Sequence, residues 1–251
     1  MKKNFSLSVL SFIILFTKCS GENTVDSKST NHDTVSVVSD HFSFLIYDGL
    51  SQNISEPILK KLEDNYARVL DDLRLSSINK VTIKIWNDET HFLNNMQNDL
   101  GIKYPGALGY VYNGSEVRIL FRGNAAQNVL HEFCHVASLV VNSRLGNNPR
   151  WFWEAVAVYE AGEFRDPKTI NYLVNGNFPT IAELNLNFNN GNNKIYEVGY
   201  LLAEFIINTW GKSNYILLIK TNGNVQGVLN ITIAEFESRW KESVSVKYLS
   251  N

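Results

Sequence analysis

The chain has only two cysteines and five prolines among its 251 residues. Two cysteines are too few for a disulfide framework, and five prolines with 15 glycines exclude collagen-like or proline-rich repeats. Basic charge is not in excess either, since 23 Lys and Arg stand against 25 Asp and Glu. This balance predicts that the chain does not bind nucleic acid. With 44% hydrophobic and 19% charged residues, the composition excludes a disordered chain and indicates one large or two small globular domains.

The N-terminus lacks an apolar run long enough to cross a membrane. Leu7–Phe16 is mostly apolar over about ten residues, which is too short to span a bilayer. Because two lysines precede this run, residues 1–18 are predicted to be a cleaved signal peptide. The segment Cys19–Glu22 resembles the start of mature bacterial lipoproteins, in which the Cys is acylated, although Lys18 replaces the usual small residue. This resemblance implies export and a membrane anchor in a bacterial cell envelope through a lipid on Cys19. The alternative is an ordinary secreted or periplasmic protein.

Composition divides the rest of the chain into three segments. Residues 19–40 are rich in Ser, Thr, Asn and Asp, which predicts a flexible tether. Residues 41–122 carry strand and helix patterns, which predict an α/β subdomain with a small mixed sheet. Residues 123–251 have few strand signals and are predicted to form a helical subdomain. The two subdomains together make one α+β domain (41–251), and we expect a site in the cleft between them.

Periodicity predicts the individual elements. Alternating apolar residues predict strands at 42–46 and 81–86, and the Asn113-Gly114 turn predicts a hairpin of strands at 106–112 and 116–121. Helical spacing predicts helices at about 55–74, from an Asp88 cap to Leu100, at 125–141 and at 153–161. Further helices are predicted at 167–174, 179–184, 194–209, 212–220 and 232–245, the last opening with a Thr232–Glu235 capping box.

The most informative segment is His131-Glu132-Phe133-Cys134-His135. Two histidines four residues apart lie on one face of a helix and can occupy two positions around a metal ion. Zinc takes three protein ligands and a water at catalytic sites, and Glu132 can act on that water as a general base. The alternative is a helix whose histidines are solvated or satisfied in the core. The flanking residues are mostly apolar, so the helix is expected to be buried and its polar groups need partners.

A third ligand is offered by Glu154, 18 residues after His135, because the polar, Gly-containing stretch 144–149 allows the chain to turn back. With Glu154 in the segment Trp151–Tyr159, the sequence resembles the gluzincin metallopeptidases of the peptidase MA-like family, and also the aminopeptidase N catalytic domain. The resemblance implies a thermolysin-like zincin fold and one Zn²⁺ per chain. It also implies that His131, His135 and Glu154 are the metal ligands, that Glu132 is the catalytic base, and that the substrate is a peptide or protein.

The segment departs from the family pattern at two positions. Ala155 replaces the usual Gly after the third ligand, and Val158 stands where some metallopeptidases carry an acidic residue that orients a ligand His. The sequence therefore leaves that carboxylate unassigned, with Glu160 as a weak candidate.

Two further segments match what the family implies. Tyr196-Glu197-Val198-Gly199 is similar to the Tyr-Glu-x-Gly of the aminopeptidase N group, which implies that Tyr196 donates a hydrogen bond to the oxyanion. Tyr200 competes for this role, and Tyr196 could instead only pack between helices. Gly106–Tyr110 corresponds to the strand edge that pairs with a substrate backbone, and the alternative is a strand with a bulge at Gly109.

The expected function is hydrolysis of peptide bonds by a zinc-activated water. An alternative from another class is a non-catalytic, zinc-containing surface lipoprotein that binds peptides or a partner protein. The intact Glu132 favours the enzyme, because a structural zinc site needs no base. Within enzymes, the acidic segment that holds a free amino terminus in the aminopeptidases is not visible in the sequence, which favours an endopeptidase.

Overall fold

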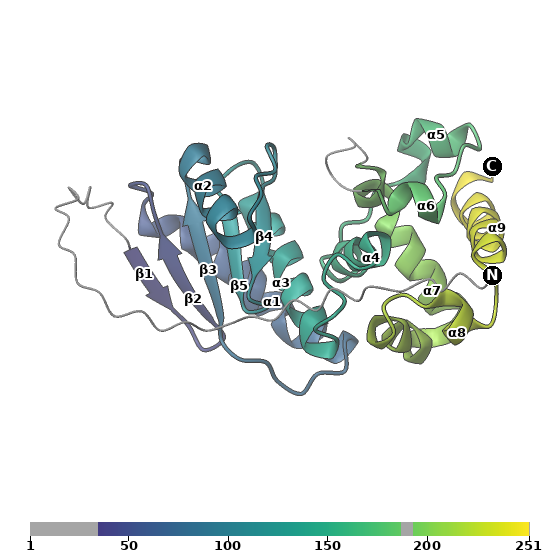
Figure 1. Cartoon of the computed structure of the whole chain (residues 1–251), viewed down its shortest axis with the longest axis horizontal. Helices are drawn as coiled ribbons and strands as arrows, with labels where there is room; N and C mark the ends of the chain where they lie inside the picture. The colour runs from purple at the N-terminus through teal and green to yellow at the C-terminus, as the bar shows by residue number, and fades with distance from the viewer. Residues whose placement is uncertain (1–34, 187–192, 251) are drawn as a thin grey trace, which may run out of the picture. The chain divides into compact units, whose positions relative to one another are not determined.

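A five-stranded mixed sheet forms the first part of the described residues, 35–186 and 193–250, in the computed structural model (Figure 1). The strands are β1 (Val35–Val38), β2 (Phe42–Ile46), β3 (Val81–Trp86), β4 (Gly109–Tyr112) and β5 (Glu116–Leu120), in the order β1-β2-β3-β5-β4. The three central strands are parallel, and each edge strand is antiparallel to its neighbour. The predicted mixed sheet is confirmed, and β4 lies at one of its edges.

The strands at 42–46 and 81–86 match the prediction, because every second side chain of β2 and β3 is buried. The Asn113-Gly114 hairpin is also confirmed, with both residues at the positive φ angles of 51° and 67° that such a turn requires. Its first strand begins at Gly109 rather than at residue 106. Gly106 has a left-handed φ of 86°, and the Ala107 N–H donates to the Tyr104 carbonyl in a turn.

The N-terminal segment differs from its prediction at one place. Residues 35–38, expected in the flexible tether, form β1 and pair with β2 in antiparallel register. The short, largely exposed strand has too few residues for a clear alternation, and its pairing comes from β2. The predicted signal peptide at 1–18, Cys19 and the tether up to residue 34 lie outside the described residues. Within the described ranges no helix combines the length and apolar character needed to cross a membrane.

Three long helices accompany the sheet. They are α1 (Ser55–Asp72), preceded by the short η1 (Gln52–Ile54), α2 (Glu89–Leu100) and α3 (Ala125–Val141). Helix α1 ends just before its predicted limit, because Arg74 adopts a φ of 56°. Asp88 caps α2 as predicted, since its side chain accepts a hydrogen bond from His91 N at 2.6 Å.

The remaining elements are helical, as predicted: α4 (Arg150–Glu160), η2 (Pro167–Thr169), α5 (Asn171–Val174), α6 (Ile181–Leu184), α7 (Lys194–Lys220), α8 (Val225–Leu229), α9 (Ile233–Val244) and the π-helical turn η4 (Ser245–Leu249). Helix α4 begins before the predicted Trp153, because Trp153 N–H already donates to the Pro149 carbonyl. The predicted break between 194–209 and 212–220 is the kink of α7 at Gly211, where φ is 82° and ψ is 161°. The Thr232–Glu235 capping box is present at α9. Helix α8 was not predicted.

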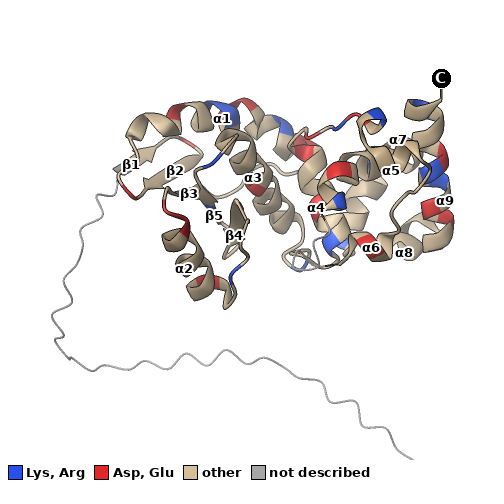
Figure 2. Ribbon diagram, turned by 90° about the horizontal axis from the view of Figure 1, so that it is seen from above, with Lys and Arg blue, Asp and Glu red and all other residues tan. Residues whose placement is uncertain are grey.

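Helix α3 is the central element of the fold. It packs on α1, β4 and β5 on one side and on α4 on the other, while α4 packs on α7 (Figure 1). The rings of Phe42 in β2 and Phe133 in α3 meet edge to face, with centroids 5.3 Å apart. Figure 2 shows acidic and basic residues distributed over both the strand-rich and the helical part. Residues on α3 therefore face strands, α4 and α7 at once.

Candidate metal centre

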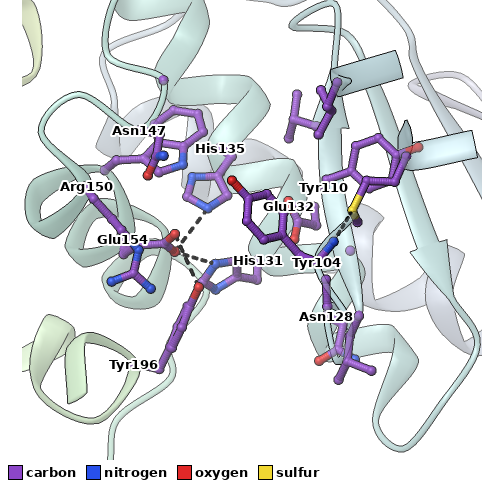
Figure 3. A pocket seen from close by; sticks show the side chains of 18 of the residues that line it. Tyr104, Tyr110, Asn128, His131, Glu132, His135, Asn147, Arg150, Glu154 and Tyr196 are labelled. Atoms are coloured by element: carbon purple, nitrogen blue, oxygen red, sulfur yellow. Dashed lines mark hydrogen bonds and ion pairs between the residues drawn. The ribbon is translucent and has the colours of Figure 1, made fainter. Parts of the chain in front are cut away.

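The two histidines of the predicted motif lie on one face of α3. Because α3 buries its apolar residues against both the sheet and α4, His131 and His135 are buried as well. Their ring centroids are 4.8 Å apart, and both rings point into a cleft (Figure 3). The spacing of four residues therefore produces the side-by-side imidazoles that it predicts.

Helix α4 brings Glu154 to this pair. Oε2 of Glu154 lies 3.4 Å from Nε2 of His131 and 3.4 Å from Nε2 of His135. In a tetrahedral site with metal–ligand distances of about 2.1 Å, ligand atoms are about 3.4 Å apart. Oε2 is buried and has no hydrogen-bond partner among the described residues. Two imidazoles and a carboxylate are a donor set that suits zinc, so these three residues fit a metal ion.

Gly199 explains how α7 approaches this site. A Cβ atom at Gly199 would lie 3.1 Å from Cα of Ala155 and 3.4 Å from Cβ of Val158. The missing side chain therefore lets α7 pack closely on α4, directly beside Glu154. This contact explains why the Tyr-Glu-x-Gly segment has a Gly at position 199 and why the residue at position 155 is small.

The carboxylate that orients His131 is Glu163. Its Oε2 lies 3.0 Å from Nδ1 of His131, and its Oε1 accepts a hydrogen bond from Gln127 Nε2 at 3.1 Å. The candidate Glu160 is wrong for this role, because its fully buried carboxylate accepts a hydrogen bond from Tyr215 instead. Glu163 lies beyond the end of α4, after a turn at Gly162 with a φ of 69°. The sequence signals a turn at Gly162, but it contains no signal for the contact between Glu163 and His131.

Burial and charge set the protonation of this cluster. Burial would lower the pKa of His131, but the Glu154 and Glu163 carboxylates beside its two ring nitrogens outweigh it and raise the pKa well above its ordinary value. Burial lowers the pKa of His135 despite the opposing effect of Glu154. Glu154 shows the reverse, because the two imidazoles overcome its burial and hold its pKa far below the usual range. A metal ion at this site would displace a proton from His131, so the affinity of the site for the metal should fall at acid pH.

Glu132 is partly buried on the floor of the same cleft. Burial raises the pKa of its carboxyl to about 8; His131 opposes the shift, and Glu154 and Glu163 add to it. Gly109 of β4 lies in close contact with this side chain, since a Cβ atom at Gly109 would lie 2.8 Å from Glu132 Oε1. The predicted base therefore lies between the metal ligands and the sheet edge.

The cleft has a volume of about 610 Å³ and is bounded on one side by β4. Leu120 N–H donates to the Leu108 carbonyl, and hydrogen-bonded pairs alternate along an antiparallel ladder. The N–H and C=O groups of Gly109 and Val111 therefore face away from β5, toward the open edge. The register of β4 with β5 is regular from Gly109 to Tyr112, so the alternative of a bulge at Gly109 is wrong.

The opposite wall carries Tyr196, from the first turn of α7. Its hydroxyl donates to Glu154 Oε1 at 3.3 Å, and its ring centroid is 6.1 Å from that of His131 (Figure 3). Burial raises the pKa of Tyr196 strongly, and the Glu154 charge adds to this while the Arg150 guanidinium opposes it. Tyr200 does not line the cleft and instead packs against Tyr159, with centroids 5.0 Å apart. The structure therefore brings Tyr196, and not Tyr200, to the ligands.

Two more side chains near the motif, those of Trp153 and Cys134, differ in their contact with the cleft. Trp153 stacks on the His135 ring with centroids 3.9 Å apart and lines the cleft. Cys134 is buried, is unpaired within the described part of the chain, and does not belong to the cluster of His131, His135 and Glu154.

Comparison of the chain with protein-family models gave no match, and comparison with curated proteins gave no match either.

Proposed function

We propose that this chain is a zinc-dependent metallopeptidase with a thermolysin-like domain of the gluzincin type. The observation that carries the proposal is the meeting of His131, His135 and Glu154, next to Glu132 and an open strand edge. Their ligand atoms all lie within 4.8 Å of one another, and Glu154 Oε2 is 3.4 Å from both imidazoles. A structural zinc site would need the three ligands but neither of the other two features. Their combination favours the enzyme over a non-catalytic, zinc-containing lipoprotein.

The side chains suit hydrolysis of a peptide bond. His131, His135 and Glu154 would hold Zn²⁺, which polarises a water molecule and a carbonyl group when bound. Glu132 accepts the proton of the attacking water and passes it to the leaving amine. Tyr196 donates a hydrogen bond to the oxygen of the attacked carbonyl. The free backbone groups of Gly109 and Val111 pair with an extended substrate.

The cleft also supports an endopeptidase over an aminopeptidase. Among the described residues that line it, the carboxylates are Glu132, Glu154 and Glu163. Each has one of the roles above, and none is left to bind a free amino terminus. An endopeptidase should cleave peptides with acetylated amino termini, whereas an aminopeptidase should not.

The test uses residues 20–251, loaded with zinc, and the Glu132→Gln variant as its matched control. We expect about one zinc per chain in both proteins, because Glu132 is not a ligand. The unaltered chain should cleave members of an acetylated peptide library, and the variant should not. Cleavage by a metal-loaded Glu132→Gln preparation would contradict the mechanism. Stoichiometric zinc without cleavage of any peptide would favour the non-catalytic alternative.

A further inference from the structure

Arg150 occupies an unusual position for a charged residue. It lies in the first turn of α4, four residues before Glu154, and therefore on the same helix face. The residue is only 4% exposed, and it lines the cleft together with Glu154 and Tyr196 (Figure 3). A buried guanidinium is costly unless its charge and its donors are satisfied.

The partners of Arg150 are incomplete. Nη1 donates to the Leu186 carbonyl at 2.9 Å and, over 3.4 Å, to the Leu184 carbonyl. Nη2 is buried and has no hydrogen-bond partner among residues 35–186 and 193–250, where no carboxylate lies at ion-pair distance from Arg150 either. The sequence between these ranges, 187–192, contains no Asp or Glu. Among the described residues, the two carbonyls thus fix the side chain, while Nη2 has no hydrogen-bond partner and no carboxylate pairs with the charge.

Tyr196 is the group against which this charge is held. The guanidinium carbon lies 5.6 Å from the centre of the Tyr196 ring, within the range of a cation–π contact. A phenol hydroxyl has one hydrogen to donate and two lone pairs to offer. A neighbouring cation is attracted to the lone pairs and repels the hydrogen. The hydrogen is therefore directed away from Arg150, as in the observed bond to Glu154 Oε1.

We propose that Arg150 is a positioning residue that keeps the Tyr196 hydroxyl as a hydrogen-bond donor toward the reacting carbonyl of a peptide substrate. The proposal rests on the peptidase function proposed above. As the carbonyl oxygen becomes negative, the Tyr196 hydrogen bond strengthens and the phenol oxygen gains negative charge. The fixed guanidinium stabilises that charge without contacting the substrate. Its contribution therefore exists only when the Tyr196 hydroxyl is present.

A double-mutant cycle tests this dependence. Tyr196→Phe should lower kcat about 100- to 1000-fold, as expected when an oxyanion donor is lost. Arg150→Met should lower kcat about tenfold with KM changed less than about twofold, within the range of coupling between contacting residues. In the Tyr196→Phe background, Arg150→Met should have no further effect on kcat. Arg150→Lys, which keeps the charge, should recover part of the loss. Arg165→Met is the matched control, because Arg165 pairs with Glu197 beside Tyr196 but does not line the cleft.

A purely structural role gives a different result. If Arg150 only joins α4 to the carbonyls at 184 and 186, Arg150→Met should lower kcat equally in both backgrounds, which would overturn the proposal. An independent readout is the ¹³Cζ resonance of Tyr196 in the metal-free, tyrosine-labelled chain, assigned by its loss in Tyr196→Phe. Arg150→Met should shift this resonance and Arg165→Met should not. If the unaltered chain cleaves no peptide, the proposed function fails, but an unshifted resonance in Arg150→Met would separately overturn the pairing.

Discussion

Gly109 of β4 has no room for a methyl group. A Cβ atom there would lie 2.7 Å from Cδ1 of Ile119, 2.8 Å from Oε1 of Glu132 and 2.9 Å from Cγ of Glu132. Gly109 is not among the glycines with positive φ, so alanine can adopt its backbone conformation. The effect of Gly109→Ala is therefore steric, and it acts on the residue that we assign as the catalytic base.

The size of the effect follows from these contacts. Non-bonded carbon atoms pack with their centres about 3.5–4.0 Å apart. Either the Glu132 side chain or β4 must therefore move by roughly 0.5–1 Å to accept the new methyl group. Overpacking of this kind costs about 1–3 kcal/mol of folding free energy, and each kcal/mol lowers the Tm of a chain this size by about 2–4 °C. A displacement of about 1 Å at a catalytic group can cost 100-fold in rate. We therefore expect kcat to fall by roughly 10- to 100-fold, with zinc content unchanged.

The assay compares Gly109→Ala with Gly146→Ala, a second cleft glycine without positive φ. A Cβ at Gly146 would meet only Cδ2 of Leu139, at an ordinary 3.6 Å. The control should keep kcat within about twofold and Tm within about 2 °C, because a surface substitution without a clash changes little. A Gly109→Ala variant with unaltered kcat and Tm would refute the placement of Glu132 against the strand edge.

Three other substitutions test the surroundings of the site. Glu163→Gln should weaken zinc affinity about 10- to 100-fold in a chelator competition, because it removes the charge that orients His131. Gly199→Ala should cost about 1–3 kcal/mol in urea unfolding and also weaken zinc binding, since its Cβ would meet Ala155 Cα at 3.1 Å; unchanged unfolding would exclude the close contact. Burial raises the pKa of Glu160 from 4.5 to about 7, so between these pH values the folded chain holds a proton that the unfolded chain has released. The stability of the unaltered chain relative to Glu160→Gln should therefore fall by about 3 kcal/mol as pH rises from 4.5 to 7, and a constant difference would contradict the shift.

The site was predictable where its information is local in the sequence. The four-residue spacing of His131 and His135 already fixes their common helix face, whatever the rest of the fold does. Glu154 could be predicted as a ligand because a stretch with turn-forming residues separates two apolar helices. The Thr232–Glu235 capping box and the Asn113-Gly114 hairpin were predictable for the same reason, since side chain and backbone within a few residues determine them.

The missed features depend on contacts between distant segments. Strand β1 is a strand because β2 pairs with it, and four residues alone do not reveal that partner. Glu163 reaches His131 only after the chain turns at Gly162, and Arg150 is significant only because α7 brings Tyr196 over it. The stacking of Trp153 on His135 has the same origin, because the two rings belong to different helices. Such contacts follow from packing, which local periodicity does not encode.

The charges around the cleft couple metal binding to the protonation state of Glu132. Three carboxylates, those of Glu132, Glu154 and Glu163, share one cleft with the imidazoles of His131 and His135. Without a cation, burial and the neighbouring carboxylates hold the pKa of Glu132 at about 8, so this carboxyl keeps its proton at neutral pH. A protonated carboxyl cannot accept a proton from water. A divalent cation beside the two imidazoles favours the ionised form of Glu132, because opposite charges nearby lower the pKa of an acid. A cation held by the proposed ligands would therefore favour the ionised Glu132 that the proposed mechanism needs, and loss of the cation would favour its protonated form.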